Sequence, residues 1–323
     1  MPDFFAPKDT LEILNPHAER CRHAGLLLSR YVPFEAIDKG QGGKSQWLRD
    51  VSRRFQVNAS NEEWHVLRGA MLNRWQAQVG AAGAQTFTRQ LQGRLIVGLG
   101  GKGVLETGIT LHYITGLPII PGSALKGLCR AYALLTLAEA LNIPLLTADE
   151  RPKSDVASPI TQLESILTEI DEDVRAEQID HLNRSHDLAV PLTLEALEQE
   201  TIRDDVHVFR AAFGSTAAAG ACVFFDAVVS KLPSSGTLFE VDVMTPHFFD
   251  YYRTDGKTPP NDDDNPNPVS FLTVARHTEF SFAVGCRRGA SDAPIDRVAN
   301  WLAIALDELG IGAKTAAGYG VFA

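Results

Sequence analysis

The sequence predicts an α+β fold, because helical and strand-like segments are grouped along the chain instead of alternating regularly. Apolar residues recur at helical spacing before residue 90, and runs of strand-forming residues dominate after residue 213. The chain has 323 residues, of which 45% are hydrophobic and 22% are charged. These values are near those of globular proteins, so the chain can bury a core without disulfides or a metal.

Residues 1–90 are predicted to form a helical N-terminal region, and residues 91–323 a second domain. Within the first region, one apolar stripe at helical spacing comprises Trp64, Leu67, Met71, Leu72 and Trp75. A strand is expected at 94–99, followed by a glycine-rich turn and an extended piece at 108–114. A helix is then expected from Pro121-Gly122 to Asn142, with Ser123 as its N-cap.

An acidic helical insertion is expected at about 142–205, with amphipathic helices at 160–179 and 192–200. Strand-like sequence follows at 222–228, 238–244 and 279–284. A proline-rich stretch at 253–268 is expected to be a loop, and its acidic run Asp262-Asp263-Asp264 is expected to be solvated. The last predicted elements are a helix over 294–309 and a short terminal strand at 321–322.

The predicted order of strand, helix, several strands, helix and strand corresponds to a ferredoxin-like βαββαβ core with insertions. RNA-recognition domains present the four-stranded sheet of this fold to single strands of RNA. The fold expectation is therefore a ferredoxin-like, RRM-like core with a helical N-terminal region and an acidic helical insertion.

The charge of the chain is unevenly distributed. The formal net charge of −10, taken as one number, argues against a nucleic-acid partner. Residues 1–135, however, contain 16 Lys and Arg against 10 Asp and Glu, whereas residues 136–205 contain 5 against 17. The acidity therefore belongs mainly to one helical segment, and the first part of the chain is basic enough to contact RNA.

We expect a cytoplasmic protein without membrane partner, metal or cofactor. The start of the sequence lacks the basic and apolar regions of a secretory signal. The charge-free run 211–225 is too short to span a bilayer. The four cysteines are far apart, with neither CxxC nor zinc-finger spacing, so no disulfide or metal site is predicted.

Two glycine motifs are reminiscent of nucleotide-binding loops, but their contexts do not fit. The run from Gly98 to Gly103 matches GxGxxG, yet an extended segment follows where a dinucleotide site needs a helix. The run Gly312-Ala313-Lys314-Thr315 lacks the first glycine of a P-loop and has no room for the following helix.

The start of the 122 helix has two open interpretations. Lys126 lies in the first turn, where the helix dipole disfavours a cation, so a phosphate bound there with Lys126 and Arg130 would explain it. Alternatively, Lys126 points into solvent and Arg130 pairs with a nearby carboxylate. At the other end of the chain, a loop of glycines presents Lys314, Thr315 and Tyr319, which offer a charge, a hydroxyl and an aromatic face.

Together these segments resemble the RAMP superfamily of CRISPR-associated RNA-binding proteins. The resemblance rests on GLG at 98–100, LETGITLH at 105–112, GLPIIPGSALKG at 116–127 and GIGAKTAAGYG at 310–320. With FGS at 213–215, FFDA at 224–227 and DVMTPH at 242–247, the sequence is most similar to the family of sixth subunits of type III-B Cmr effector complexes. The likeness covers about residues 20–323, and the acidic segment is its least typical part.

The resemblance implies a noncatalytic subunit that binds the 3′ side of the guide RNA and caps the filament of backbone subunits in antiviral defence. It implies guide and target RNA, the repeated backbone subunit and the first head subunit as partners. The expected RNA-binding side chains are Lys102, His112, Ser123, Lys126, Arg130, Lys314, Thr315 and Tyr319. The expected glycine-rich loops contain Gly98, Gly100, Gly101, Gly103, Gly122, Gly310, Gly312, Gly318 and Gly320.

Two alternatives stay open. The chain could itself be an endoribonuclease, with Glu106 and His112 as base or metal ligand, although Glu106 could equally pair with Lys102 and His112 serve the sheet. It could also be a protein-only cap whose glycine turns face another subunit and contact no RNA.

Overall fold

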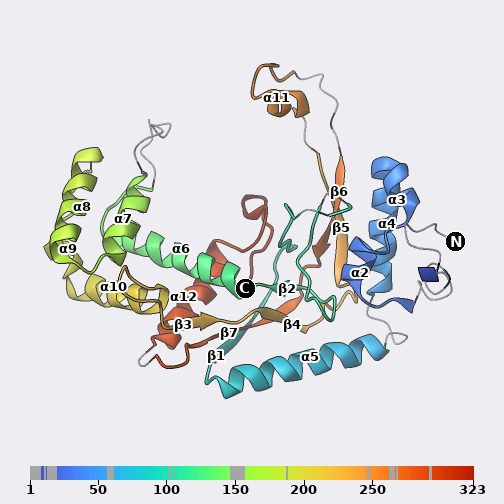
Figure 1. Cartoon of the computed structure of the whole chain (residues 1–323), viewed down its shortest axis with the longest axis horizontal. Helices are drawn as coiled ribbons and strands as arrows, with labels where there is room; N and C mark the ends of the chain where they lie inside the picture. The colour runs from blue at the N-terminus through green and yellow to red at the C-terminus, as the bar shows by residue number, and fades with distance from the viewer. Residues whose placement is uncertain are drawn as a thin grey trace.

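The computed structural model describes residues 9, 10, 12, 20–56, 62–101, 103–105, 107–145, 157–186, 188–245, 248–261, 266, 268–290 and 293–323. Within these residues the chain is an α+β protein, as expected, and its strands form two antiparallel sheets where one four-stranded sheet is predicted (Figure 1). The described helices include none that is long and apolar enough to cross a membrane. The predicted acidic run at 262–264 lies outside the described residues.

Helices dominate the N-terminal part, as predicted. They are α2 (Ala24–Ser29), α3 (Phe34–Asp38), α4 (Gly40–Arg54) and α5 (Glu62–Ala81). Helix α4 packs against the smaller sheet, which consists of β5 (Phe239–Met244) and β6 (Val269–Val274). Strand β1 (Gln85–Gln90) begins before the predicted division at residue 90, which itself stays a prediction.

The prediction of the first strand at 94–99 is wrong. This segment makes only a single bridge, between Leu95 and Val274 of β6. Strand β1 instead lies just before it and pairs with β7 (Glu279–Cys286) from Gln85↔Val284 to Gln90↔Glu279. The sequence QTFTRQ contains one apolar residue, Phe87, which stacks on Phe282 of β7 at 5.2 Å between ring centroids.

The larger sheet is antiparallel and has the order β1-β7-β4-β2, with β3 also pairing with β7. Its remaining strands are β2 (Ile119–Ile120), β3 (Cys222–Phe224) and β4 (Ala227–Lys231). The expected terminal strand is reduced to one bridge between Leu91 and Phe322, flanked by reciprocal backbone hydrogen bonds between Gln90 and Ala323.

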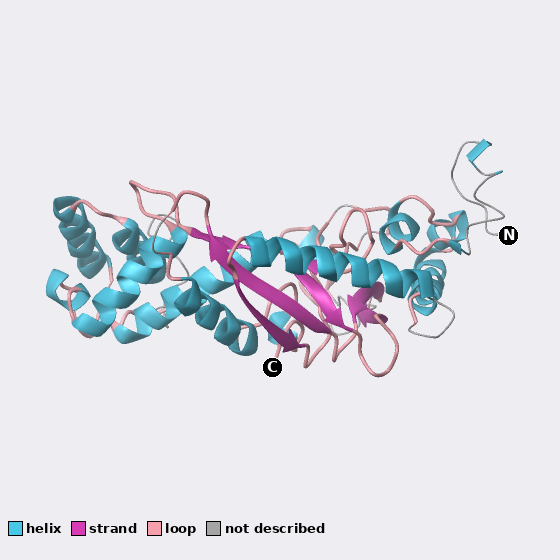
Figure 2. Cartoon of the chain, turned by 90° about the horizontal axis from the view of Figure 1, so that it is seen from below, coloured by secondary structure: helices cyan, strands magenta, loops and turns pink. Residues whose placement is uncertain are grey.

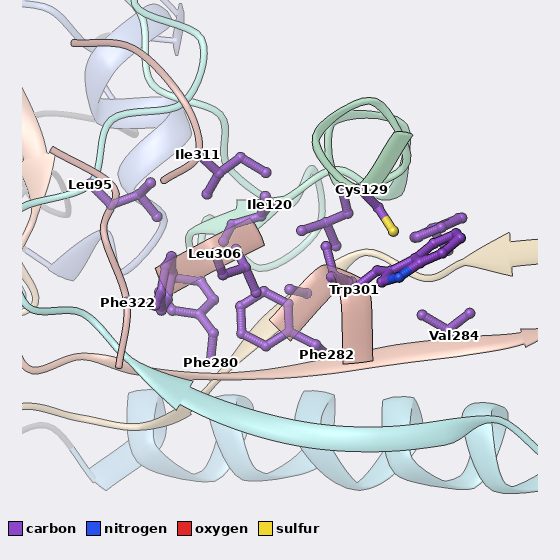
Figure 3. Packing of buried hydrophobic residues seen from close by; sticks show 14 of the residues in the cluster. Leu95, Ile120, Cys129, Phe280, Phe282, Val284, Trp301, Leu306, Ile311 and Phe322 are labelled. Atoms are coloured by element: carbon purple, nitrogen blue, oxygen red, sulfur yellow. The ribbon is translucent and has the colours of Figure 1, made fainter. Parts of the chain in front are cut away.

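Two long helices cover one face of the larger sheet. These are α6 (Gly122–Ala140) and α12 (Ile295–Glu308), both close to their predicted limits. Between them and the strands lies the main core, in which Phe280, Phe282 and Phe322 meet edge to face at 5.4 to 6.1 Å (Figure 3). Burial of these aromatic rings stabilises the closure of the chain end onto the sheet.

Helix α5 lies against the opposite face of the same sheet (Figures 2 and 3). Its Trp75 and Val79 form a second buried cluster with Val228 of β4 and Ala283 of β7. The indole Nε1 of Trp75 donates to the backbone oxygen of Asp226 at 2.8 Å. Helix α5 therefore covers part of the sheet face opposite α6 and α12.

The acidic segment is helical, but its helices differ from the prediction. They are α7 (Pro159–Thr168), α8 (Glu172–Ser185), α9 (Leu194–Leu197) and α10 (Glu200–Phe213), at the opposite end of the molecule from α4 (Figure 1). The single helix expected at 160–179 is interrupted, because Asp171 caps α8 by accepting from the amides of Asp173 and Val174. The short helix α11 (Phe249–Arg253) lies between β5 and β6.

Candidate nucleic-acid interface

The terminal glycine-rich segment, 310–320, lies against the extended segment 94–97, which leads directly into the other glycine-rich segment, 98–103. The amide of Ala313 donates to the Ile96 oxygen at 2.8 Å, and the amide of Gly320 donates to the Arg94 oxygen at 2.7 Å. Gly312 has φ +96°, and a Cβ there would overlap the Ile96 carbonyl. Glycine is therefore required for the close approach of these two segments.

The glycine surface, as we call residues 98–101, 103 and 312–318, exposes backbone. Gly100, Gly103 and Gly318 are exposed, and a Cβ at any of them would meet no atom within 4 Å. Among the described residues, the amides of Gly312 and Lys314 have no hydrogen-bond acceptor. Such exposed amides suit phosphate or sugar oxygens, which accept hydrogen bonds and have no sequence preference. Lys102 lies outside the described residues.

Lys314 and Thr315 belong to this surface. Lys314 adopts a left-handed conformation with φ 63°, immediately before the short 3-10 helix η2 (Thr315–Ala317). Its ammonium lies 5.9 Å from the centroid of the Phe271 ring, a cation–π contact. Both side chains are half-buried, so the loop presents one charge and one hydroxyl beside its free amides.

Tyr319 has a structural partner. Its hydroxyl donates to Asp242 of β5, and its ring packs 6.3 Å from that of Phe271. Arg94 donates to the same Asp242 carboxylate and to Glu240, both at 2.6 Å. This cluster ties the terminal loop to the smaller sheet, and stacking of Tyr319 on a base stays a prediction.

The cluster shifts the pKa of its members in opposite directions. Hydrogen bonding to Glu240 is the main cause that raises the pKa of Arg94. Burial tends to raise the pKa of Asp242, but hydrogen bonds from Tyr319, the Val243 amide and Arg94 outweigh burial and lower it. Burial, followed by the Asp242 hydrogen bond and charge, raises the pKa of Tyr319. The carboxylate is thereby kept ionised and the phenol neutral.

The start of α6 differs from the prediction. Pro121, not Ser123, is the N-cap residue, and Ser123 is exposed and makes no capping hydrogen bond. The Gly122 amide instead donates at 2.7 Å to the carboxylate of Asp226, which follows β3. Gly122 is also buried, and it lies so close to the Phe224 carbonyl that a Cβ there would overlap it. An acidic side chain of the protein therefore already occupies part of the expected anion position.

Lys126 and Arg130 have different environments. Lys126 is half-buried and forms no ion pair with any described residue, and its charge lowers the pKa of the Cys222 thiol, which places the two close together. Arg130 pairs with Glu164 of α7 and lies 5.7 Å from the Phe209 ring centroid. The carboxylate-pairing interpretation therefore holds for Arg130, while Lys126 has its charge free for a ligand.

His112 lies on a separate cavity of about 420 Å³ between α5 and the 112–119 turn. Its Nδ1 accepts from the Thr115 amide at 3.3 Å and lies 3.1 Å from the Thr115 hydroxyl. Trp75 and Asp226 line the same cavity. Glu106, the other residue of the nuclease alternative, lies outside the described residues. Among those described, no group of three or more His, Cys, Asp or Glu side chains could hold a metal ion.

Sequence reasoning missed three residues of this region: Arg94, Trp75 and Asp226. In the sequence, Arg94 marks only the start of an apolar run, and Trp75 is one member of an apolar stripe. Asp226 belongs to the FFDA motif, but its partner Gly122 is 104 residues earlier in the chain. No local signal links the two, since the contact depends on β3 lying beside the start of α6.

The sequence of this chain is similar to those of known proteins. The model of the RAMP superfamily matches residues 90–323. CRISPR system Cmr subunit Cmr6 of Pyrococcus furiosus is 33% identical over 234 residues, which are 71% of this chain and 64% of that relative. The chain thus spans less than two thirds of the length of this relative.

Two solved structures are similar in part. The crystal structure of Cmr6 from Pyrococcus furiosus has a TM-score of 0.42 and 29% identity, over 74% of this chain and 96% of that one. A cryo-EM structure of the type III-B Cmr-beta bound to cognate target RNA has a TM-score of 0.47 and 16% identity, over 87% and 72% of the two chains. Because the superfamily model matches well over half of the sequence, this chain belongs to the RAMP superfamily.

Proposed function

We propose that this chain is a noncatalytic RNA-binding subunit of a type III-B Cmr effector complex. In this role it binds the 3′ side of the guide RNA and caps the filament of backbone subunits in antiviral defence. Membership of the RAMP superfamily and the 33% identity to a Cmr6 subunit support the proposal. Its partners would be guide RNA, target RNA, the repeated backbone subunit and the first head subunit, in the cytoplasm.

The observation that carries the RNA-binding part is the convergence of the two glycine-rich segments. They are more than 200 residues apart in sequence, yet segment 310–320 hydrogen-bonds to the backbone oxygens of Arg94 and Ile96, directly before segment 98–103, and both segments contain exposed glycines. A guide RNA of variable sequence needs contacts to its backbone more than to its bases. Base pairing between guide and target would then supply the sequence specificity.

We also propose that the core is ferredoxin-like. In hydrogen-bonding order, the segments are the terminal residues 321–323, then β1, β7 and β4, with β2 at the edge. Helices α6 and α12 connect them as the two crossover helices of a βαββαβ unit. The isolated bridge at Phe322 stands in for the fourth strand of that unit.

Binding to single-stranded RNA at several salt concentrations tests the function. Lys126→Ala and Lys314→Ala should each weaken binding by the full chain and reduce the slope of log affinity against log salt by about 0.7 for each lost phosphate contact. Lys257→Ala is the matched control, because Lys257 is exposed, follows α11 and is not among the residues of the glycine surface. Unchanged affinity and slope in both variants would contradict this binding surface.

The noncatalytic part requires a separate test in the assembled complex. Glu106→Ala and His112→Ala should leave cleavage of target RNA intact, because the proposed subunit binds RNA without cutting it. In agreement with a structural role, His112 Nδ1 lies within hydrogen-bonding distance of the Thr115 hydroxyl. Loss of cleavage in both variants, with guide RNA still bound, would favour the endoribonuclease alternative.

Crosslinking of the assembled complex to labelled guide RNA tests the protein-only cap, since a cap that contacts no RNA would give no crosslink to this chain.

A further inference from the structure

Three cysteines that are far apart in sequence come together between the start of α6 and the ends of β3 and β7. Cys222 of β3 and Cys286 of β7 are directly opposite each other in the antiparallel register. Cys129 of α6 is buried in the core (Figure 3), and burial, followed by the charge of Cys222, raises the pKa of its thiol. Cysteine spacing alone predicted no such group.

The hydrogen bonds around Cys222 and Cys286 define the type of pair that they form. The Arg287 amide donates to the Ala221 oxygen at 2.7 Å, and the Phe225 amide donates to the Ala283 oxygen at 3.1 Å. Hydrogen-bonded and non-hydrogen-bonded pairs alternate along an antiparallel ladder, so Cys222 and Cys286 occupy a non-hydrogen-bonded pair. In such pairs the Cα atoms are about 4.5 Å apart, within the range of about 4.4–6.8 Å found in disulfides.

The two thiols also differ in accessibility. Cys286 is half-buried at the end of β7, and its thiol donates to the oxygens of Arg287 and Ala290 at 3.4 and 3.3 Å. Cys222 is only 5% exposed, next to Cys286. Cys129 is fully buried, and its thiol points to the Val298 oxygen of α12 at 3.6 Å. An oxidant from solvent can therefore reach Cys286 first, while Cys129 is shielded.

We propose that Cys222 and Cys286 are a peroxide-responsive dithiol that closes to a cross-strand disulfide. The Cys286 thiol loses its proton, and the thiolate attacks hydrogen peroxide, forming an S–O bond and breaking the O–O bond. One oxygen leaves as hydroxide and takes up that proton to become water, so Cys286 becomes a sulfenic acid. The Cys222 sulfur then attacks the Cys286 sulfur, forming the S–S bond and breaking the S–O bond, and the second oxygen leaves as water with the Cys222 proton. The two sulfurs lose two electrons in total and the two peroxide oxygens gain them.

The disulfide would form next to the candidate interface. It would link β3 covalently to the end of β7, and β3 contacts the first turn of α6, where Gly122 packs against the Phe224 carbonyl. A thiol pair of this kind in a reducing compartment is typical of transient, redox-sensing disulfides. The proposal does not depend on RNA binding, because the chemistry can be followed on the chain alone.

Peptide mapping of the full chain after peroxide treatment tests the proposal. The chain is oxidised, its remaining thiols are blocked with N-ethylmaleimide, and its digest is examined by mass spectrometry without reduction. We expect one Cys222–Cys286 crosslinked peptide, lighter by about 2 Da than the two separate peptides. Dithiothreitol should restore both. Cys21→Ser is the matched control and should leave the crosslink unchanged, whereas Cys286→Ser should abolish it.

Two further readouts make the outcome decisive. Burial and the neighbouring Cys286 raise the pKa of the Cys222 thiol to about 11, against the opposing effect of Lys126. The rate of disulfide formation from the oxidised Cys286 should therefore increase about tenfold for each pH unit between about 7 and 9, as the Cys222 thiolate fraction grows.

The disulfide should also raise the Tm of the chain by on the order of 5–10 °C, and reduction should reverse this increase. Oxidation that stops at a Cys286 sulfenic or sulfinic acid, or that links Cys222 to Cys129, would overturn the proposal.

Discussion

Asp226 shows how one side chain positions the start of a helix. Its carboxylate accepts from the Gly122 amide, and its own backbone oxygen accepts from Trp75. A single residue after β3 therefore connects α6 on one face of the sheet to α5 on the other. A carboxylate at this position also interacts favourably with the positive end of the α6 dipole.

Replacement of Asp226 therefore has a defined consequence. Asp226→Ala should lower the free energy of unfolding by about 0.5–2 kcal/mol, because the α6 N-terminus loses its capping acceptor. Asp226→Asn keeps a side-chain oxygen and should lose less. Chemical denaturation of the three proteins measures the difference. Equal stability of the alanine variant and the unmodified protein would show that the cap contributes nothing.

At the scale of elements, the terminal glycine loop depends on two positions where a side chain has no room. Gly312 and Gly320 both have positive φ, and a Cβ at Gly320 would overlap the Ile311 carbonyl. Gly312→Ala and Gly320→Ala should each destabilise the protein by about 1–3 kcal/mol through backbone strain. Gly100→Ala is the control, because a Cβ there meets no atom within 4 Å. Thermal unfolding compares the three, and a fall in Tm for the control as large as for Gly312→Ala would contradict the packing argument.

Helices could be predicted from sequence far better than strands. The limits of α6 and α12 follow from apolar spacing and from the Pro and Gly residues at their ends, which are local signals. The apolar run at 94–99 has the composition of a strand, but Gly98 turns the chain with φ +86° and only Leu95 makes a β-bridge. Strand β1 has almost no apolar pattern, and its strand character comes from its partner β7.

Individual residues and loops of the candidate site can be proposed from the sequence, but the contacts between them cannot. The glycine-rich segments and Lys126 were identified because glycine and lysine in these contexts have local meaning. The pairing of Arg130 with Glu164, the capping by Asp226 and the apposition of Cys222 and Cys286 all join segments distant in sequence. Such contacts depend on the register of the sheet, which one sequence does not reveal.

At the scale of the whole molecule, the Arg94 cluster joins three parts: the segment after β1, the smaller sheet and the terminal loop. Because the folded pKa of Asp242 lies below its unfolded value, its stabilising effect is present above about pH 4 and is lost as the pH falls. Asp242→Asn should therefore lower Tm near neutral pH, and the difference from the unmodified protein should shrink toward pH 3. A difference that stays constant over this range would exclude the ionised carboxylate as its source.

The pairing of β1 with β7 sets the time that β1 must wait for its partner strand during synthesis on the ribosome. Gln90 and Glu279 are partners, yet they are 189 residues apart in the sequence. A ribosome adding about 5–20 residues per second exposes β1 for about 10–40 seconds before its partner emerges. During that interval the edge of β1 is open to other chains. Synthesis speed, and chaperones that shield this edge, should accordingly govern how much of the protein reaches its folded state.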